Sequence, residues 1–235
     1  MAIPDRWGLS GRRLYLCTPD RADLEQFVGS CIDGGVDIVQ LREKHLDDRR
    51  LAERALLVQR VCADRGVPFI LNDRPDLAAA IGADGVHVGQ DDASPFEARR
   101  VVGEQAVIGL STHAVREVEA AVGIRPSGEE PSHAAAGTPP GAAPVQYLSA
   151  GPVSPTPTKP GRPGTGLGYI SEAVALSPWP VWITGGVEPS TVEAMAEAGA
   201  RHFVVVRWLC QAEDPARNAR RLRRAIDRAV PPVPA

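Results

Sequence analysis

Short runs of apolar and β-branched residues recur along the chain, and longer segments of mixed apolar and charged residues separate them. The short runs are bounded by Gly, Pro, Asp or Asn, a pattern that is typical of buried β-strands. The predicted strands cover residues 13–18, 37–42, 69–73, 85–89, 107–112, 145–151, 180–186 and 202–208. Because strands that alternate with helices build βα units, we expect one parallel sheet.

Several of the longer segments carry the sequence signals of amphipathic helices. Residues 47–66 place their apolar side chains, from Leu51 to Cys62, at helical spacing and their charges on the other faces. Residues 188–200 begin with the capping residues Pro, Ser and Thr, and residues 214–230 are strongly basic. We assign the arginines of this basic helix to a solvated outer face rather than to an acidic partner.

The number and order of these elements predict the fold class. Eight βα units fit a single-domain (β/α)8 TIM barrel over residues 1–235, with its core between residues 12 and 230. A doubly wound sheet is the competing fold, and it predicts a Gly-rich turn after the first strand. The chain continues there as PDRADLE (19–25), so we favour the closed barrel.

One segment interrupts the regular alternation of strands and helices. Residues 124–144 are rich in Pro, Gly, Ala and Ser and contain few large apolar side chains. Such a segment buries too little surface to offset the entropy that is lost on ordering. We interpret it as a flexible insertion between the fifth helix and the sixth strand, not as a domain boundary.

Composition and charge exclude several classes of partner. With 26 basic and 29 acidic residues, the net charge is −3, which gives no indication of a nucleic-acid or membrane partner. The N-terminus has no signal-peptide core, and no apolar run is long enough to span a bilayer. The scattered cysteines, Cys17, Cys31, Cys62 and Cys210, indicate reduced thiols in a cytoplasmic protein. A homo-oligomer is possible.

Polar residues collect where the predicted strands end, and in such a barrel the carboxyl ends of the strands hold the chemistry. Charged side chains follow the second to fourth strands, hydroxyls and a lysine follow the fifth and sixth, and glycines follow the seventh. These residues are Arg42, Lys44, Asp73, Asp92, Ser111, Thr156, Thr158, Lys159, Gly185 and Gly186. Two carboxylates beside lysines suit a phosphate ligand bridged by Mg²⁺, which prefers oxygen ligands.

Each of these positions also has a structural explanation. The alternatives are helix caps at Asp73, Asp91 or Asp92, an ion pair between Arg42 and Glu43, a plain turn at Gly185–Gly186 and a packed, hydrogen-bonded His87. A ligand site is favoured because several independent positions fall at the same end of the predicted barrel.

Five motifs, in their order and spacing, resemble the thiamine-phosphate synthase family. They are QLREK (40–44), LNDRPDLAAAIGADGVHVGQDD (71–92), IGLSTH (108–113), GPVSPTPTKPG (151–161) and ITGGV (183–187), and the resemblance covers essentially the whole chain. It implies that 4-amino-5-hydroxymethyl-2-methylpyrimidine diphosphate is condensed with 4-methyl-5-(2-phosphoethyl)-thiazole. The implied products are thiamine phosphate and pyrophosphate, the implied cofactor is Mg²⁺, and the implied partners are these small molecules.

The resemblance also implies roles for individual residues. Substrate binding is implied for Gln40, Leu41, Arg42, Glu43, Lys44, Asn72, Ser111, Thr156, Pro157, Thr158, Lys159, Gly186, Val206 and Arg207. Within this set Lys159, Ser111 and Arg42 are implied to be catalytic, and Asp73 and Asp92 are the implied Mg²⁺ ligands. Many relatives have a Val-Ser pair where this chain has Val206-Arg207, so backbone contacts can persist there while Arg207 adds a charge.

Two other functions are compatible with the same fold. A thiazole tautomerase would not need both aspartates together with Lys159, and a non-catalytic phosphate-sensing barrel would bind its ligand without releasing pyrophosphate. The synthase reaction needs no Ser-His-Asp set, because the thiazole nitrogen carries no proton to remove. The loop TPTKP (156–160) is then a candidate lid.

Overall fold

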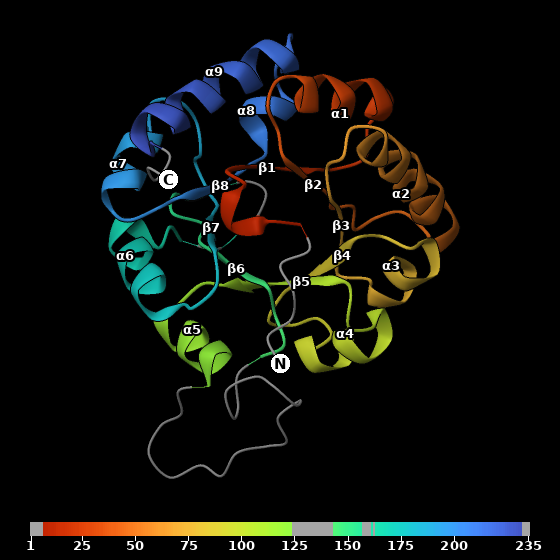
Figure 1. The fold of residues 1–235 in the computed structure, drawn as a ribbon, viewed down its shortest axis with the longest axis horizontal. Coiled ribbons are helices and arrows are strands. Elements are labelled where there is room, and N and C mark those ends of the chain that lie inside the picture. The colour runs from red at the N-terminus through yellow and green to blue at the C-terminus, as the bar shows by residue number, and fades with distance from the viewer. Residues whose placement is uncertain (1–6, 124–142, 157–160, 162, 232–235) are drawn as a thin grey trace.

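The computed structural model describes residues 7–123, 143–156, 161 and 163–231, and this part of the chain forms the expected barrel (Figure 1). Eight parallel strands are hydrogen-bonded in chain order, and β8 pairs with β1 to close the barrel. The strands are β1 (Leu14–Thr18), β2 (Ile38–Leu41), β3 (Phe69–Asn72), β4 (Gly85–Val88), β5 (Val107–Thr112), β6 (Tyr147–Ala150), β7 (Val181–Ile183) and β8 (His202–Val205).

Helices surround the barrel and cover the outer face of the sheet (Figure 1). They are α1 (Leu24–Asp33), α2 (Asp48–Ala63), α3 (Pro75–Ile81), α4 (Pro95–Val102), α5 (Val115–Val122), α6 (Gly166–Leu176), α7 (Val192–Glu197), α8 (Arg207–Cys210) and α9 (Pro215–Ala229). A short 3-10 helix, η1 (Leu9–Gly11), precedes β1. The closed ring of alternating strands and helices confirms the predicted TIM-barrel fold class.

Two helix starts decide the capping interpretation of the aspartates. α4 begins with a capping box at Ser94, whose side chain accepts a hydrogen bond from the helix backbone. Neither Asp91 nor Asp92 occupies this N-cap position, so the capping interpretation of these two residues is wrong. The N-cap position of α3 belongs to Arg74, and Asp73 therefore does not cap that helix either.

The last predicted strand, residues 202–208, is too long. β8 ends at Val205, and α8 begins at Arg207. The chain turns at Val206, whose carbonyl oxygen accepts a hydrogen bond from the backbone N–H of Leu209. Because apolar residues continue from the strand into this short helix, the hydrophobic pattern alone does not mark the boundary.

Apolar side chains fill two regions, one on each side of the sheet. The first is the shell between strands and helices, to which α2 contributes the predicted residues Leu51, Ala55, Val58 and Cys62. The second lies inside the barrel and contains Leu9, Tyr15, Ile38, Ile70, Val107, Tyr147 and Trp182. Two positions further along several strands, the inward-facing side chains become polar, as at Gln40 and Asn72. The barrel interior is therefore apolar at one end and polar at the other.

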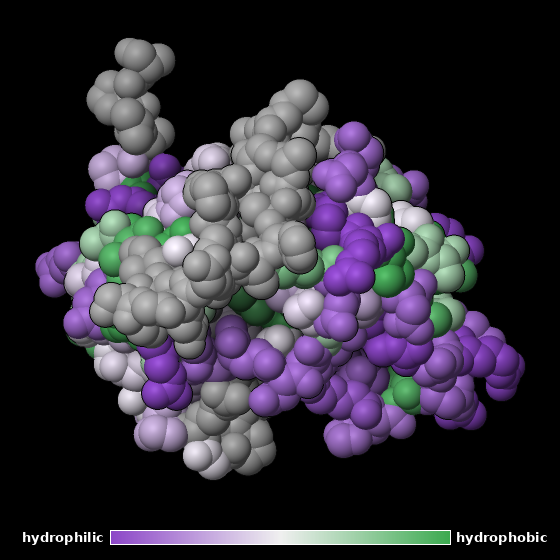
Figure 2. Space-filling view, turned by 90° about the horizontal axis from the view of Figure 1, so that it is seen from below, coloured by the Kyte–Doolittle hydropathy of each residue, from purple (hydrophilic) through white to green (hydrophobic). Residues whose placement is uncertain are grey.

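The outer faces of the helices are largely polar. On the face shown in Figure 2, hydrophilic residues predominate and hydrophobic residues occur in small scattered groups. Most arginines of α9 are exposed, as expected for an outer face, while Leu222 and Ile226 are buried beneath them. Within the described ranges, every helix is too short or too polar to cross a bilayer.

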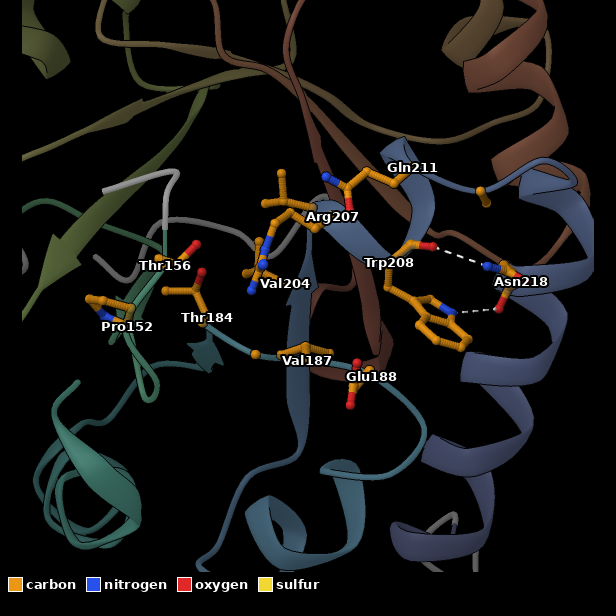
Figure 3. A pocket seen from close by; sticks show the side chains of 14 residues that line it. Pro152, Thr156, Thr184, Val187, Glu188, Val204, Arg207, Trp208, Gln211 and Asn218 are labelled. Atoms are coloured by element: carbon orange, nitrogen blue, oxygen red, sulfur yellow. Dashed lines mark hydrogen bonds between the residues drawn. The ribbon is translucent and has the colours of Figure 1, made fainter. Parts of the chain in front are cut away.

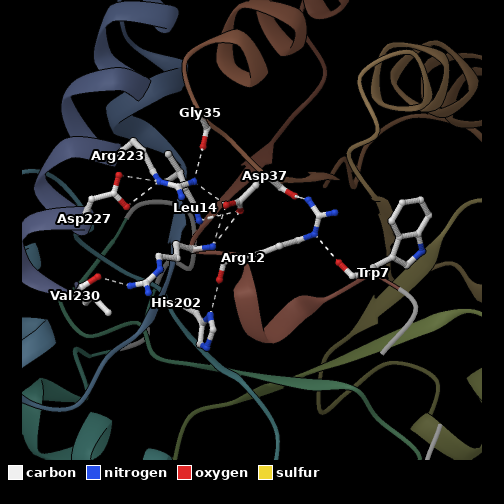
Figure 4. A network of polar contacts seen from close by, with 10 residues as sticks. Trp7, Arg12, Leu14, Gly35, Asp37, His202, Arg223, Asp227 and Val230 are labelled. Carbon is white, nitrogen blue, oxygen red and sulfur yellow. Dashed lines mark hydrogen bonds and ion pairs between the residues drawn. The ribbon is translucent and has the colours of Figure 1, made fainter. Parts of the chain in front are cut away.

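A polar network closes the amino-terminal end of the barrel around Asp37 (Figure 4). The Asp37 carboxylate accepts hydrogen bonds from the backbone N–H groups of Arg13 and Leu14, each at 3.0 Å, and pairs with Arg223 of α9 at 2.8 Å. Burial raises the pKa of Asp37, and the hydrogen bonds and nearby arginine charges oppose this rise. One partly buried carboxylate thus joins the first strand to the last helix.

His202 lies at the same end of the barrel and gives its stability a pH dependence. The Nδ1 atom of His202 hydrogen-bonds to the carbonyl oxygen of Arg12 at 2.6 Å, and burial lowers the pKa of the ring. The folded chain therefore binds a proton here less readily than the unfolded chain, whose histidine titrates near 6.5. Its contribution to stability is present above about pH 6.5 and is lost as the pH falls toward the folded pKa.

We expect the free energy of unfolding to decrease as the pH falls from about 7 to about 5, and we expect His202→Gln to flatten this part of the curve. The glutamine amide can still donate to the Arg12 carbonyl oxygen but takes up no proton in this range. Urea unfolding at a series of pH values measures the slope. An identical slope in the variant and the parent would contradict the assignment to His202.

The predicted insertion, residues 124–144, lies outside the described residues except for Ala143 and Pro144. The flanks on its two sides are adjacent, because the backbone N–H of Ala143 donates to the carbonyl oxygen of Ala121 at 2.7 Å. The buried guanidinium of Arg99 donates to the carbonyl oxygen of Pro144 at 3.2 Å and to the Gln146 side chain at 2.9 Å. The chain is therefore fixed on both sides independently of the residues between.

A variant in which about four Gly and Ser residues replace residues 124–142 is expected to keep the fold. Its free energy of unfolding should rise by roughly 1 kcal/mol, because closing a shorter loop costs less entropy. Urea unfolding of the variant beside the parent chain measures this difference. A loss of cooperative unfolding would show instead that the removed residues hold the barrel together.

Candidate active site

Side chains from all around the barrel line a cavity of about 60 Å³ at the carboxyl ends of the strands. Its polar lining residues include Gln40, Arg42, Asn72, His87, Ser111, Ser149 and Thr184. They face inward because successive side chains of a strand point to opposite faces of the sheet. Five predicted site residues, Gln40, Arg42, Asn72, Ser111 and Val206, are thus brought together. The side chain of Leu41 instead packs in the outer shell under the helices.

A cluster of two carboxylates and a lysine lies at the same end of the barrel as this cavity, on one side of it. The Lys44 Nζ atom lies 2.8 Å from Asp73 Oδ2, and the Asp92 carboxylate is near enough to Asp73 to affect its pKa. Burial raises the pKa of Asp73, the hydrogen bond with Lys44 lowers it, and the neighbouring Asp92 raises it again. Asp92 raises the pKa of Asp73 because like charges repel, and a cation between the two carboxylates would relieve this repulsion.

The backbone explains how the two carboxylates meet. Asp73 continues the ladder of β3, since its N–H donates to the carbonyl oxygen of His87 at 2.8 Å. It then adopts φ 62°, a left-handed conformation that Asp tolerates better than most residues. After β4, the loop returns on itself, because the Gly89 N–H donates to Asp92 Oδ2 at 2.9 Å. Both carboxylates are therefore positioned by their own strand ends.

Glu43 has a structural role in the loop after β2. Its carboxylate accepts hydrogen bonds from the backbone N–H groups of Lys44 at 2.8 Å and His45 at 2.9 Å. The structure records no ion pair between Glu43 and Arg42 in the described residues, so that alternative is wrong. Arg42 instead extends the ladder through its N–H to Thr18, at 2.8 Å, and lines the cavity. Glu43 therefore holds the backbone of this loop, and Arg42 and Lys44 are the loop residues available to a ligand.

A chain of buried hydrogen bonds runs beneath the cavity. Gln40 Nε2 donates to the Tyr15 hydroxyl at 2.8 Å, and the hydroxyls of Tyr15 and Tyr147 are 2.9 Å apart. The Tyr147 hydroxyl lies 3.0 Å from His87 Nδ1, and His87 Nε2 lies 2.9 Å from Ser111 Oγ. The packed, hydrogen-bonded interpretation of His87 is therefore confirmed. Tyr15 and Tyr147 are site residues that the sequence analysis missed, although their alternation with outward-facing neighbours could have identified them.

A second pocket, of about 330 Å³, opens beyond β7 and β8 (Figure 3). It is lined by Thr156, Thr184, Gly185, Gly186, Val206 and Arg207, among others, and the two pockets share Thr184, Val204 and Val206. The Arg207 side chain points from α8 toward the side of the pocket formed by Thr184 (Figure 3). The predicted residues Thr156, Gly186, Val206 and Arg207 therefore meet here, whereas Pro157, Thr158 and Lys159 lie outside the described residues.

The two glycines after β7 do more than make a turn. Gly185 and Gly186 have φ values of 93° and 83°, and both line the second pocket. A Cβ atom at Gly185 would lie 2.5 Å from the Cβ atom of Pro152, so the absence of a side chain allows the β6–α6 loop to approach. Thr191, near the start of α7, fixes the turn by donating to the Gly186 carbonyl oxygen at 2.7 Å. The pocket wall is therefore backbone rather than side chain.

Polar contacts also brace the far wall of the second pocket (Figure 3). The indole N–H of Trp208 donates to the carbonyl oxygen of Asn218 at 3.2 Å, and the Asn218 amide donates to the Trp208 carbonyl oxygen at 3.1 Å. These bonds tie α8, which carries Arg207, to the long helix α9. Neither Trp208 nor Asn218 belongs to a sequence motif that indicates the site, so their roles become visible only in the structure.

The family model described as thiamine monophosphate synthase matches residues 14–209 of the chain. A thiamine-phosphate synthase of Thermus thermophilus is 45% identical over 226 residues, which cover 91% of this chain and 97% of that protein. A thiamine-phosphate synthase of Thermobifida fusca is 40% identical over 222 residues, covering 93% and 94%. Among solved structures, a thiamine phosphate pyrophosphorylase from Pyrococcus furiosus shares the fold, with a TM-score of 0.77 at 24% identity over 92% of this chain and 96% of that chain. From the family model and from relatives that align over nearly their whole length, the chain belongs to the thiamine monophosphate synthase family.

Proposed function

We infer that the chain is a thiamine-phosphate synthase, which joins the pyrimidine diphosphate to the thiazole phosphate and releases pyrophosphate. The observation that carries this inference is the meeting of Lys44, Asp73 and Asp92 at one rim of a polar cavity. A diphosphate needs cations to bind it, and two carboxylates beside a lysine provide both a direct charge and a place for a metal ion. Membership of the family supports the same conclusion.

Asp73 and Asp92 fit Mg²⁺ by the chemistry of their donor atoms. Mg²⁺ takes oxygen ligands and is commonly held by one or two carboxylates together with substrate phosphates and water. No group of three or more His, Cys, Asp or Glu side chains with suitable geometry occurs in the described residues, so the diphosphate would have to complete the coordination. When bound, Mg²⁺ supplies positive charge that offsets the charge on the departing pyrophosphate.

The two pockets suit the two substrates. Arg42 and Lys44 provide charge for the diphosphate, and Gln40 and Ser111 offer polar contacts to the pyrimidine ring in the cavity. In the second pocket the backbone of Gly186 and the guanidinium of Arg207 suit the phosphate of the thiazole. Because the pockets share a wall, two substrates bound in this way would meet at the mouth of the barrel.

The residues of the chain would act by binding and orientation. The bond between the pyrimidine methylene carbon and the diphosphate oxygen breaks, and pyrophosphate leaves with the electron pair. The thiazole nitrogen then uses its lone pair to form the new carbon–nitrogen bond. No proton is transferred, so Lys44 and Arg42 need only hold the diphosphate while Gln40 and Ser111 hold the ring in line.

Lys159 lies outside the described residues, and its role as a diphosphate contact stays a prediction from the sequence motif. We expect Lys159→Ala to lower kcat by roughly 10²–10³, the scale for removing one group that stabilises charge in a transition state. The free energy of unfolding should change little. Near-normal turnover in this variant would remove Lys159 from the site.

The proposed function is tested by mixing the pyrimidine diphosphate, the thiazole phosphate and Mg²⁺ with the chain and measuring pyrophosphate. We expect pyrophosphate and thiamine phosphate to appear in equal amounts, and only when both substrates and the metal are present. A phosphate-sensing barrel would bind the substrates without releasing pyrophosphate. A thiazole tautomerase would convert only an isomer of the thiazole, and either result would contradict the proposal.

A further inference from the structure

The buried hydrogen-bond chain beneath the cavity ends at two side chains that face the proposed pyrimidine. Gln40 stands at one end and Ser111 at the other, and Tyr15, Tyr147 and His87 lie between them. Each link measures between 2.8 and 3.0 Å, and each of the five side chains is at least nine-tenths buried. The links are therefore shielded from water, and each donor must be matched by an acceptor.

The direction of every hydrogen bond follows from the first one. Gln40 Nε2 is a donor only, so the Tyr15 oxygen accepts. Because Tyr147 is the other partner recorded for the Tyr15 hydroxyl within the described residues, the hydrogen of Tyr15 is given to Tyr147. The Tyr147 oxygen accepts that hydrogen and donates its own to His87 Nδ1. A ring nitrogen that accepts carries no proton, so the neutral imidazole has its proton on Nε2. His87 Nε2 then donates to Ser111 Oγ, which leaves the hydroxyl hydrogen of Ser111 to be donated elsewhere.

One observation supports this direction over its reverse, and a second shows that both phenols are able to donate. The Cys17 thiol donates to Gln40 Oε1 at 3.2 Å, which places the amide oxygen toward the sulfur and the amide nitrogen toward Tyr15. Burial raises the pKa values of Tyr15 and Tyr147, so both phenols keep the hydrogens that the chain requires. Within the described residues, Ser111 Oγ has no recorded hydrogen-bond partner besides His87, and Ser111 lines the cavity.

We propose that Tyr15, Tyr147 and His87 are positioning residues whose one-directional hydrogen bonds hold His87 as the Nε2–H tautomer and make Ser111 a hydrogen-bond donor to the ligand. The matching ligand atom is an unprotonated ring nitrogen, and the remaining amide hydrogen of Gln40 offers a second donor on the same ring edge. The identity of this ligand as the pyrimidine rests on the proposed function. The tautomer of His87 does not, because it follows from the protein alone.

The tautomer is measured by NMR of the full chain labelled with ¹⁵N at its histidines. The His87→Gln variant identifies the His87 signals by their disappearance. In the parent chain we expect Nδ1 to be unprotonated and Nε2 to be protonated. In Tyr15→Phe, which removes the hydroxyl that hydrogen-bonds to Tyr147, we expect the two tautomers to become mixed. Tyr147→Phe should give the same mixture by removing the direct partner.

Tyr169→Phe is the matched control. Its hydroxyl donates to Thr112 Oγ1 at 2.8 Å. The variant therefore loses a largely buried tyrosine hydrogen bond that is not part of the series from Gln40 to Ser111. We expect the His87 tautomer to be unchanged in this variant. A purely structural role for the tyrosines would affect all three variants through stability alone and would leave the tautomer of His87 pure in each.

The kinetic expectation separates this inference from the proposed function. In Tyr15→Phe we expect the KM for the pyrimidine diphosphate to rise about tenfold, the scale of one hydrogen bond, while the KM for the thiazole phosphate stays unchanged. A pure Nε2–H tautomer in Tyr15→Phe, or a protonated Nδ1 in the parent chain, would overturn the inference even if the enzyme is active. The tautomers can behave as expected while the parent protein forms no pyrophosphate. In that case the proposed function is wrong, and the inference about the hydrogen bonds remains supported.

Discussion

Asp92→Asn is expected to lower kcat for pyrophosphate release by roughly 10²–10³ while the protein remains folded. The substitution removes one of the two charges that would hold Mg²⁺ at the diphosphate, but the asparagine oxygen can still accept the hydrogen bond from the Gly89 N–H. The loss should therefore come from charge and not from a rearranged loop. The Mg²⁺ concentration that gives half-maximal rate should rise in the same variant, and steady-state kinetics over a range of Mg²⁺ concentrations measures both effects.

Asp76→Asn provides the control for this prediction. Asp76 is a carboxylate at the start of the neighbouring helix α3, where it pairs with Arg74 at 2.7 Å. Its substitution removes the same charge at the same end of the barrel but outside the cluster of Lys44, Asp73 and Asp92. We expect turnover within about twofold of the parent, because exposed ion pairs contribute little. Equal losses in the two variants would mean that general charge at this face, rather than a metal site, governs the rate.

Gly185→Ala is expected to lower kcat/KM for the thiazole phosphate by roughly 10². The new Cβ atom would lie 2.5 Å from the Pro152 Cβ atom, 2.6 Å from the Pro152 Cα atom and 2.7 Å from the Val153 nitrogen. Two of these are backbone atoms, so the β6–α6 loop must move away from the β7 turn. A displacement of about 1 Å in a substrate pocket is enough for a loss of this size.

The control for this variant separates contact from backbone strain. Gly166 also has a positive φ, of 75°, but a Cβ atom there would meet nothing within 4 Å. Gly166→Ala therefore carries a similar conformational cost without the steric contact. We expect both variants to lose some stability by thermal unfolding and only Gly185→Ala to lose activity of this order. Comparable activity in the two variants would show that the approach of the two loops does not matter for the site.

The sequence predicts the barrel well because its signals are local and repeated. Each strand is a short apolar run with a polar or glycine boundary, and the same signal recurs eight times in chain order. The rule that strand ends hold the chemistry then brings Lys44, Asp73 and Asp92 to one rim without any knowledge of their contacts. The strand boundary at Val206 is not predicted, since Trp208 and Leu209 resume the apolar pattern of the strand after Arg207, inside the short helix.

Other features of the site depend on contacts between distant residues, which no local pattern encodes. The hydrogen bond between Tyr15 and Tyr147 joins positions that are 132 residues apart in the chain. It also requires Gly109, because a Cβ atom there would lie 2.0 Å from the Tyr147 ring. Similarly, Glu43 sits within a binding motif, but its hydrogen bonds to the backbone of its own loop become visible only in the folded chain.

The most direct test of the account is a crystal structure of the chain with Mn²⁺, as a substitute for Mg²⁺, and pyrophosphate. The anomalous signal of manganese locates the metal independently of the protein. We predict one strong peak within coordination distance of both the Asp73 and Asp92 carboxylates, with pyrophosphate oxygens on the metal and on Lys44. A metal and pyrophosphate bound together elsewhere, with no metal at these two carboxylates, would contradict the account.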